Sequence, residues 1–289
     1  MRLDDEPESD NVEDGRGSGG GIGRLGGVGI GTVVIALVAS YFFGIDPSTI
    51  LSMGQATQGQ TTSGPTQPID PAQDPDAALK LEMTHVLHNT ETTWGKIFAE
   101  MGSEYRKPKL YLYNGQTSTA CGVGQAAMGP FYCPGDQKVY LDMAFFREME
   151  RRFRVSGDFA RAYVIAHEIG HHVQKLTGVS DKTDAMRQRL SEKEFNKVSV
   201  RVELQADCYA GAWAYHANRA KPFLDPQDID EALKAANAIG DDMLQKQARG
   251  VVVPDSFTHG SSAQRVRWFK TGFETGNLKA CDTFAARDV

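Results

Sequence analysis

The chain has 289 residues, of which 40% are hydrophobic, and it carries a formal net charge of −6. This length permits one large domain or two small ones. The acidic balance and the lack of a basic stripe argue against nucleic acid as a partner.

Three segments precede the expected folded domain. Residues 1–24 are acidic and then glycine-rich, which predicts a disordered cytoplasmic tail. Residues 25–45 include an uncharged stretch of about 19 residues, just long enough for a helix to span a bilayer core, so they predict a transmembrane anchor. Residues 46–73 mix Gln, Thr, Gly, Ser and Pro without periodicity, which predicts a flexible linker.

The basic residues around this stretch predict its orientation. Arg16 and Arg24 precede it, and no Lys or Arg follows until Lys80. The positive-inside rule then places the N-terminus in the cytoplasm and the rest of the chain in the periplasm, as in a single-pass protein of the inner membrane. A signal peptide cleaved near residues 38–40 is the alternative, although its charged region would be unusually long and acidic.

The folded domain is expected over residues 74–289, and its first half contains one helix and two strands. An Asp-Pro pair predicts the start of a helix over residues 74–101. Residues 109–113 and 138–142 alternate between apolar and polar side chains, which predicts strands. The glycine-rich stretch 117–132 between them is the candidate for the sheet edge and the rim of a substrate cleft.

A short histidine motif follows in an apolar, helix-periodic segment. His167 and His171 are four residues apart, so they lie on one face of a helix and can bind one zinc ion together. Glu168 lies between them, where a carboxylate can serve as the general base beside a metal-bound water. The alternative is an exposed polar helix, but the apolar run that begins at Phe159 favours a buried one.

A second helix is expected to supply the third ligand of a catalytic zinc. Glu203 and Asp207 are four residues apart in an apolar-periodic segment over residues 195–220. We expect Glu203 to bind the metal and Asp207 to accept a hydrogen bond from a zinc-bound histidine. In the alternative, both acids face solvent. Two more helices are expected over residues 225–248 and 261–274.

Three segments carry a resemblance to a known family. They are AHEIGHHVQ (166–174), RVELQADCYAGAW (201–213) and GPFYCPGDQKVYLD (129–142), and they resemble the bacterial putative neutral zinc metallopeptidases. The two paired motifs also look like the gluzincin arrangement. The resemblance implies an α+β fold, a mostly helical zincin-like domain with a small sheet, preceded by one transmembrane helix. The resemblance does not establish a substrate. The paired motifs predict one Zn²⁺ per chain, and a peptide or protein is the expected substrate.

A third cluster resembles the histidine-plus-arginine element of membrane-associated gluzincins. By this likeness His259 would stabilise the oxyanion opposite the zinc, and Arg265 would orient the loop or a nearby acid. The alternative is a surface histidine that precedes a helix capped by Ser261 or Ser262.

The four cysteines fit an oxidising compartment and allow three pairings. Cys121 and Cys133 flank a glycine-rich turn region and could join a hairpin. Cys208 and Cys281 then remain for each other and would tie the C-terminal tail to the second-motif helix. Thiolate zinc ligands are the alternative, but the sequence lacks a C-x-x-C pair.

Three functions remain open at this stage. The first is a membrane-anchored zinc endopeptidase that faces the periplasm. The second is a zinc-bearing binding or scaffold protein without turnover. The third is a metallohydrolase acting on cell-wall peptides. Glu168 favours catalysis over the second, and nothing in the sequence separates the first from the third.

Overall fold

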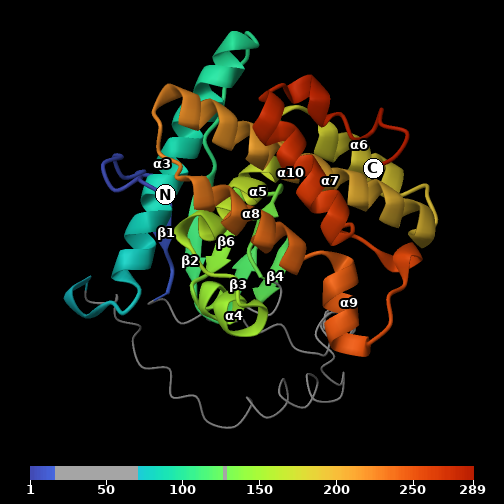
Figure 1. Ribbon diagram of the computed structural model, residues 1–289, viewed down its shortest axis with the longest axis horizontal. Helices are drawn as coiled ribbons and strands as arrows, with labels where there is room; N and C mark the ends of the chain where they lie inside the picture. Colours follow the sequence, from blue (N-terminus) through green and yellow to red (C-terminus); the bar gives the residue numbers. More distant parts are fainter. Residues whose placement is uncertain (17–70, 126–128) are drawn as a thin grey trace.

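The computed structural model describes residues 1–16, 71–125 and 129–289 (Figure 1). The predicted membrane anchor and residues 46–70 of the predicted linker lie outside the described residues. Among the residues described, no helix is long and apolar enough to span a membrane. The elements in chain order are β1 (Val12–Asp14), η1 (Pro71–Gln73), α3 (Ala77–Glu100), β2 (Lys109–Tyr113), β3 (Gln116–Thr119), β4 (Gly122–Gln125), β5 (Phe131–Cys133), β6 (Lys138–Asp142), α4 (Ala144–Phe153), α5 (Asp158–Leu176), α6 (Val179–Arg187), α7 (Glu192–Ala220), α8 (Pro226–Ala238), α9 (Asp241–Arg249), η3 (Pro254–Ser256), α10 (Ser262–Thr275) and η4 (Leu278–Cys281).

The main sheet has the strand order β1-β2-β6-β5. Strands β1, β2 and β6 run parallel, whereas β5 is antiparallel to β6 and forms an edge. The two predicted strands are confirmed with the same bounds as β2 and β6. Helices surround this small sheet in Figure 1, which confirms the expected α+β class with helices dominating.

The predicted cleft rim, residues 117–132, is divided in the structure. Strands β3 and β4 form a separate antiparallel hairpin. Residues 126–128 lie outside the described part of the chain. Phe131 and Tyr132 then enter β5, so the last residues of the predicted rim form the edge of the main sheet.

The N-terminal segment corrects one expectation. We predicted that residues 1–24 are disordered, but residues 1–16 are ordered and pack on the domain. Leu3 is buried, and β1 pairs with β2. The Ser9 hydroxyl donates to the buried carboxylate of Glu91, 2.9 Å away. A composition rule missed this because the partners of the segment lie far along the chain.

Two predicted helix bounds also change. Helix α3 begins at Ala77 rather than at residue 74, because the Asp74 carboxylate accepts the backbone N–H of Asp76 in a turn before the helix. The helix predicted over 225–248 is broken into α8 and α9 around Gly240. A Cβ at Gly240 would lie 2.4 Å from the backbone nitrogen of Ser262, so the break lets the start of α10 approach.

Close helix crossings bring α5, α7 and α10 together. A Cβ at Gly170 of α5 would lie 2.9 Å from the carbonyl oxygen of Ala206 in α7. At the next crossing, a Cβ on Gly272 of α10 would lie 1.9 Å from the carbonyl oxygen of Cys208. Glycine is therefore required at both crossings. The first crossing lies between the two sequence motifs and places their side chains next to each other.

Both expected disulfides are present. Cys121–Cys133 joins the turn after β3 to β5, and Cys208–Cys281 joins α7 to η4. The described residues include no free cysteine. The C-terminal tail is therefore attached covalently to the helix that carries Glu203.

Candidate metal centre

His167, His171 and Glu203 converge in the structure. The first two come from α5 and the third from α7. The Nε2 atoms of His167 and His171 lie 3.1 and 3.6 Å from the two carboxylate oxygens of Glu203. Ligand atoms about 2.1 Å from a tetrahedral zinc are about 3.4 Å apart. The three side chains therefore fit one zinc ion in both spacing and chemistry.

His167 is held by a buried charged cluster. Its Nδ1 donates to the Asp207 carboxylate, 2.8 Å away. The Arg265 guanidinium contacts both oxygens of Asp207, at 2.9 and 3.0 Å, and the Tyr163 hydroxyl donates to the same carboxylate at 2.5 Å. Asp207 and Arg265 are buried, so the pair is shielded from solvent. This arrangement directs the His167 Nε2 atom toward Glu203.

His171 is held by an uncharged partner. Its Nδ1 lies 2.9 Å from the side-chain oxygen of Gln174, one helical turn further along α5. Gln174 is buried and also contacts α7. Both candidate histidine ligands therefore have an acceptor at Nδ1 and present Nε2 to the same carboxylate, which is the orientation that a metal requires.

Burial and charge shift the pKa values at the centre. Burial works to lower the pKa of His167, but Asp207 and Glu203 outweigh it and raise that pKa to about 10. Burial works to raise the pKa of Glu203, but the neighbouring histidines hold it well below its usual range. Burial raises the pKa of Glu168, against the effect of His167 and His171. Glu168 is thus a buried carboxylate with increased proton affinity beside the ligand group.

His259 lies on the loop before α10, and its loop is held by Asp241. One Asp241 oxygen accepts the backbone N–H groups of Thr258, His259 and Gly260 at 2.7, 2.7 and 3.0 Å. The His259 Nδ1 lies 3.3 Å from the other oxygen. Glu203 and Asp241 raise the pKa of His259 although removal from water opposes this. Asp241 therefore fixes the backbone of this loop, and the His259 side chain is 41% exposed.

Of the two predicted roles for the cluster before the last helix, the helix cap is confirmed, and the oxyanion role of His259 stays a prediction. Ser261 does cap α10 and accepts the backbone N–H of Gln264. Arg265 contacts the acid Asp207, which is one of the two roles predicted for it.

Comparison with known proteins gives the family. The sequence profile described as putative neutral zinc metallopeptidase matches residues 1–284. The chain belongs to this family. It is also similar to the uncharacterized protein YpfJ of Escherichia coli K12, with 46% identity over 98% of this chain and 99% of that one. The uncharacterized protein Mb2605 of Mycobacterium bovis shares 46% identity over 64% and 65% of the two chains. No solved structure matches significantly.

The family match begins at residue 1 and so includes the N-terminal segment that packs on the domain. The family name implies zinc, and the centre described above is a group of His and Glu side chains able to hold it. The relatives named here carry no assigned activity, so mechanism and substrate are argued below.

Sequence reasoning missed three side chains around the centre of this family member. Tyr163 lies four residues before His167, and Gln174 lies three residues after His171. Helical spacing was therefore a signal that could have found both side chains. Asp241 has only a weak signal, an acid in the first turn of a helix. Its role depends on a loop that returns 17 to 19 residues later, which no local pattern reveals.

Proposed function

We propose that this protein is a gluzincin-like zinc peptidase, in which His167, His171 and Glu203 hold the metal. One observation carries the proposal. Both imidazoles present Nε2 to one carboxylate, and each has its Nδ1 committed to a buried acceptor. When bound, zinc would polarise the substrate carbonyl and lower the pKa of a water molecule.

Glu168 is the proposed general base. It is buried directly beside the two histidines, and its pKa is raised mainly by burial. A carboxylate of increased proton affinity can accept the proton of the attacking water and pass it to the nitrogen of the leaving amine. The breaking C–N bond thereby releases a neutral amine.

His259 is the proposed donor to the oxygen of the scissile carbonyl. A ring N–H of its imidazole can donate a hydrogen bond to the negative charge that develops on that oxygen. The three backbone hydrogen bonds to Asp241 fix the loop before substrate arrives. A fixed donor avoids reorganisation during the reaction.

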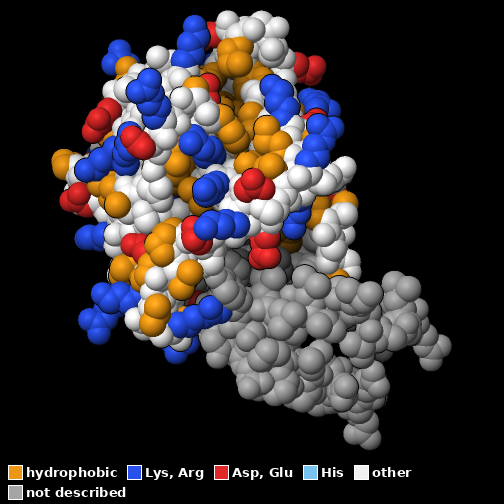
Figure 2. All heavy atoms as spheres, turned by 90° about the vertical axis from the view of Figure 1, so that its right-hand side faces the viewer, with side chains coloured by type: hydrophobic (Ala, Val, Ile, Leu, Met, Phe, Trp, Pro, Cys, Tyr) orange, Lys and Arg blue, Asp and Glu red, His pale blue; other side chains and the backbone are white. Residues whose placement is uncertain are grey.

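An extended peptide is the substrate that the sheet supports. Strand β5 ends the described sheet and is antiparallel to its neighbour. A hydrogen bond of 2.9 Å between the Tyr132 hydroxyl and His172 Nδ1 connects this strand to α5. Such an edge can pair with the backbone of an extended chain. Figure 2 shows basic, acidic and hydrophobic side chains together on one face of the molecule.

For location, we propose an extracytoplasmic, oxidising compartment at the cytoplasmic membrane. The two disulfides support the oxidising compartment, because such bonds persist outside the reducing cytosol. The uncharged stretch within residues 25–45 supports contact with a membrane.

The test compares the full-length protein with its Glu168→Gln variant. Both are incubated with a peptide library, and cleavage products are identified by mass spectrometry alongside metal analysis. We expect one zinc per chain in both proteins and new peptide ends only with the parent protein. Zinc without cleavage in either protein would support the scaffold function instead. Cleavage restricted to cell-wall peptides would support the third function.

A further inference from the structure

A hydrogen-bond chain runs from His171 to the C-terminal tail. The Gln174 amide nitrogen donates to the backbone oxygen of Val202 at 2.7 Å and to the side-chain oxygen of Gln205 at 3.1 Å. Two acceptors on this nitrogen fix the amide orientation, so the amide oxygen must face His171. The His171 proton then lies on Nδ1, and the Nε2 lone pair remains for a metal.

The chain continues through Gln205 to the tail disulfide. The Gln205 amide nitrogen donates to the backbone oxygen of Cys281 at 3.0 Å. Cys281 is bonded to Cys208, which lies on the same helix as Gln205. Gln174 and Gln205 are both buried, so water does not replace these contacts easily. The disulfide thus holds the last acceptor of the chain in position.

We propose that Gln174 is a positioning residue for zinc and that Gln205 and the Cys208–Cys281 disulfide hold it in place. This rests on the proposed zinc site. Loss of an outer-shell partner typically weakens metal affinity by about 10–100-fold. The effect should decrease along the chain, because Gln205 and the disulfide act on His171 through Gln174.

The experiment measures zinc dissociation constants by competition with a chelator, using the full-length protein. We expect Gln174→Leu to weaken zinc binding by about 10–100-fold and Gln205→Leu by less. Cys208→Ser/Cys281→Ser should weaken it in the same direction. Gln188→Leu, at an exposed position outside the chain of contacts, is the matched control and should bind zinc like the parent.

Cobalt substitution gives a second measurement, because its visible spectrum reports the ligand geometry. An altered spectrum in Gln174→Leu supports the positioning role. An unchanged affinity and spectrum in Gln174→Leu would overturn it. A parent protein that binds no zinc would instead overturn the proposed function itself, so the two failures are distinguishable.

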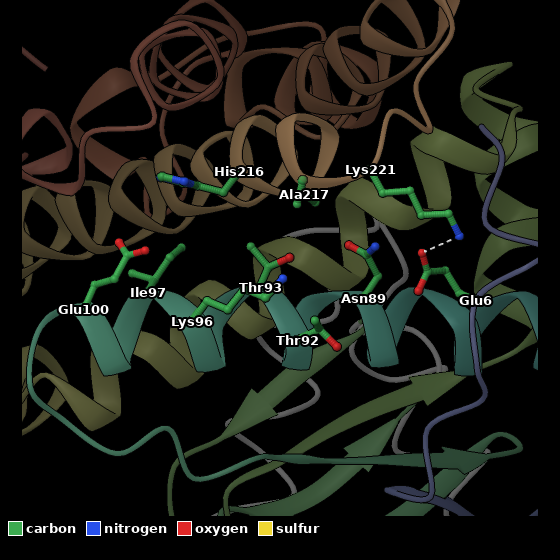
Figure 3. A pocket seen from close by; sticks show the side chains of 11 residues that line it. Glu6, Asn89, Thr92, Thr93, Lys96, Ile97, Glu100, His216, Ala217 and Lys221 are labelled. Atoms are coloured by element: carbon green, nitrogen blue, oxygen red, sulfur yellow. Dashed lines mark hydrogen bonds and ion pairs between the residues drawn. The ribbon is translucent and has the colours of Figure 1, made fainter.

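A separate observation concerns the N-terminal segment, residues 1–16. Several contacts attach it to the domain in addition to the Ser9–Glu91 hydrogen bond. Strand β1 pairs in parallel with β2, the Arg2 backbone N–H donates to the Phe223 oxygen at 2.8 Å, and Glu6 forms a 3.1 Å ion pair with Lys221. Figure 3 shows this ion pair at one end of a surface groove between α3 and the end of α7. The segment is thus part of the folded domain.

Arg16 joins the end of this segment to the start of α3. Its side chain is buried and contacts two carboxylates, with Nε 2.9 Å from Asp14 and Nη1 3.0 Å from Asp74. Lys80 of α3 adds a 2.9 Å ion pair with Asp14. The end of the N-terminal segment and the start of α3 therefore lie together on the domain.

We infer that residues 1–16 and residues 71–289 lie on the same side of the membrane. A single crossing between Arg16 and Asp74 would put β1 and β2 on opposite sides, and their parallel pairing could not form. The orientation predicted from the basic residues, with the N-terminus alone in the cytoplasm, is incompatible with this pairing.

The test labels single cysteines in the full-length protein expressed in intact bacteria. Asp10→Cys and Ser103→Cys place thiols at exposed positions of the two parts, and the four native cysteines are in disulfides. A membrane-impermeant maleimide is applied before and after permeabilisation. We expect both thiols to react in the same condition, whichever it is. Labelling of one before and the other only after permeabilisation would overturn the inference, and equal melting temperatures of the variants verify their folding.

Discussion

Two groups of side chains in the described part of the chain could each surround a cation, and their surroundings differ. The first group is His167, His171 and Glu203, and the second is Asp158, Asp228 and Glu231. In the second group, Asp158 and Asp228 accept hydrogen bonds from the amino nitrogen of Met1 at 3.2 and 3.1 Å. They also accept the backbone N–H groups of Phe159 and Asp225 at the starts of α5 and α8.

The comparison teaches that proximity of ligand atoms does not define a metal site. In the acidic group, N–H donors already engage the carboxylate oxygens, as expected at helix N-termini. In the histidine group, the Nδ1 atoms donate to Asp207 and Gln174, and the Nε2 atoms are directed at the Glu203 carboxylate. The outer partners therefore decide which group is prepared for a cation.

The largest expected effect comes from removing a ligand of the first group. Glu203→Ala should lose most of its zinc and its activity, because a histidine pair alone leaves two metal positions without protein ligands. The matched change in the second group, Glu231→Gln, should keep one zinc per chain. Metal analysis of both purified variants measures this. If Asp207→Ala loses zinc while Glu203→Ala keeps it, the third ligand is Asp207 and the assignment of Glu203 is wrong.

The next effect separates binding from catalysis within the first group. Glu168→Gln should keep its zinc and fold but lose roughly 10²–10⁴-fold in turnover, the usual contribution of a general base. Peptide hydrolysis and metal content are measured on one preparation. Glu104→Gln, at an exposed position, should retain full activity. An active Glu168→Gln enzyme would refute the assignment.

A smaller effect is expected from the loop beside the first group. His259→Ala should lower kcat by about 10²–10³-fold with little change in KM, zinc content or melting temperature, because the donor acts on charge that develops in the transition state. Steady-state kinetics and thermal melting on the same sample measure this. A variant that loses stability but keeps its activity would show that His259 only supports the loop.

The smallest effect concerns His172, the neighbour of His171. Burial lowers its pKa to about 4, although its contact with the Arg106 carbonyl opposes this. The unfolded chain binds this proton below pH 6.5 while the folded protein does not, so stability is lost as pH falls from 6.5 to 4. The variant His172→Gln cannot titrate at this position. The free energy of unfolding of the parent should therefore fall by roughly 2–3 kcal/mol more than that of the variant between pH 7.5 and 4.5. Denaturant unfolding of both proteins at both pH values measures this. An equal difference in free energy of unfolding at the two pH values would contradict the prediction.

The sequence predicted the parts of the site that depend on local spacing. The motifs around His167 and Glu203 do lie on helices, and strands β2 and β6 have their predicted bounds. Helical and strand periodicity carry this information within a few residues. The pairing of the cysteines also followed from their positions, once the hairpin was recognised.

The remaining features depend on contacts between distant residues. Strand β1 has three residues and no periodicity of its own, and its partner β2 lies almost 100 positions away. The break at Gly240 follows from the close approach of Ser262 rather than from the helix sequence. Asp241 likewise acts on a loop that only the tertiary fold brings back. Local propensity cannot encode such pairings.

The crossing at Gly170 has a consequence for the time at which the protein acquires its metal. In an unfolded chain, only His167 and His171 are near each other, which is a weak two-ligand site that many divalent ions can occupy. Glu203 joins them after the backbones of α5 and α7 have come into contact at Gly170 and Ala206. High affinity thus requires the docked helices, and metal binding and helix docking should stabilise each other. A larger residue at position 170 would therefore delay maturation as well as distort the centre.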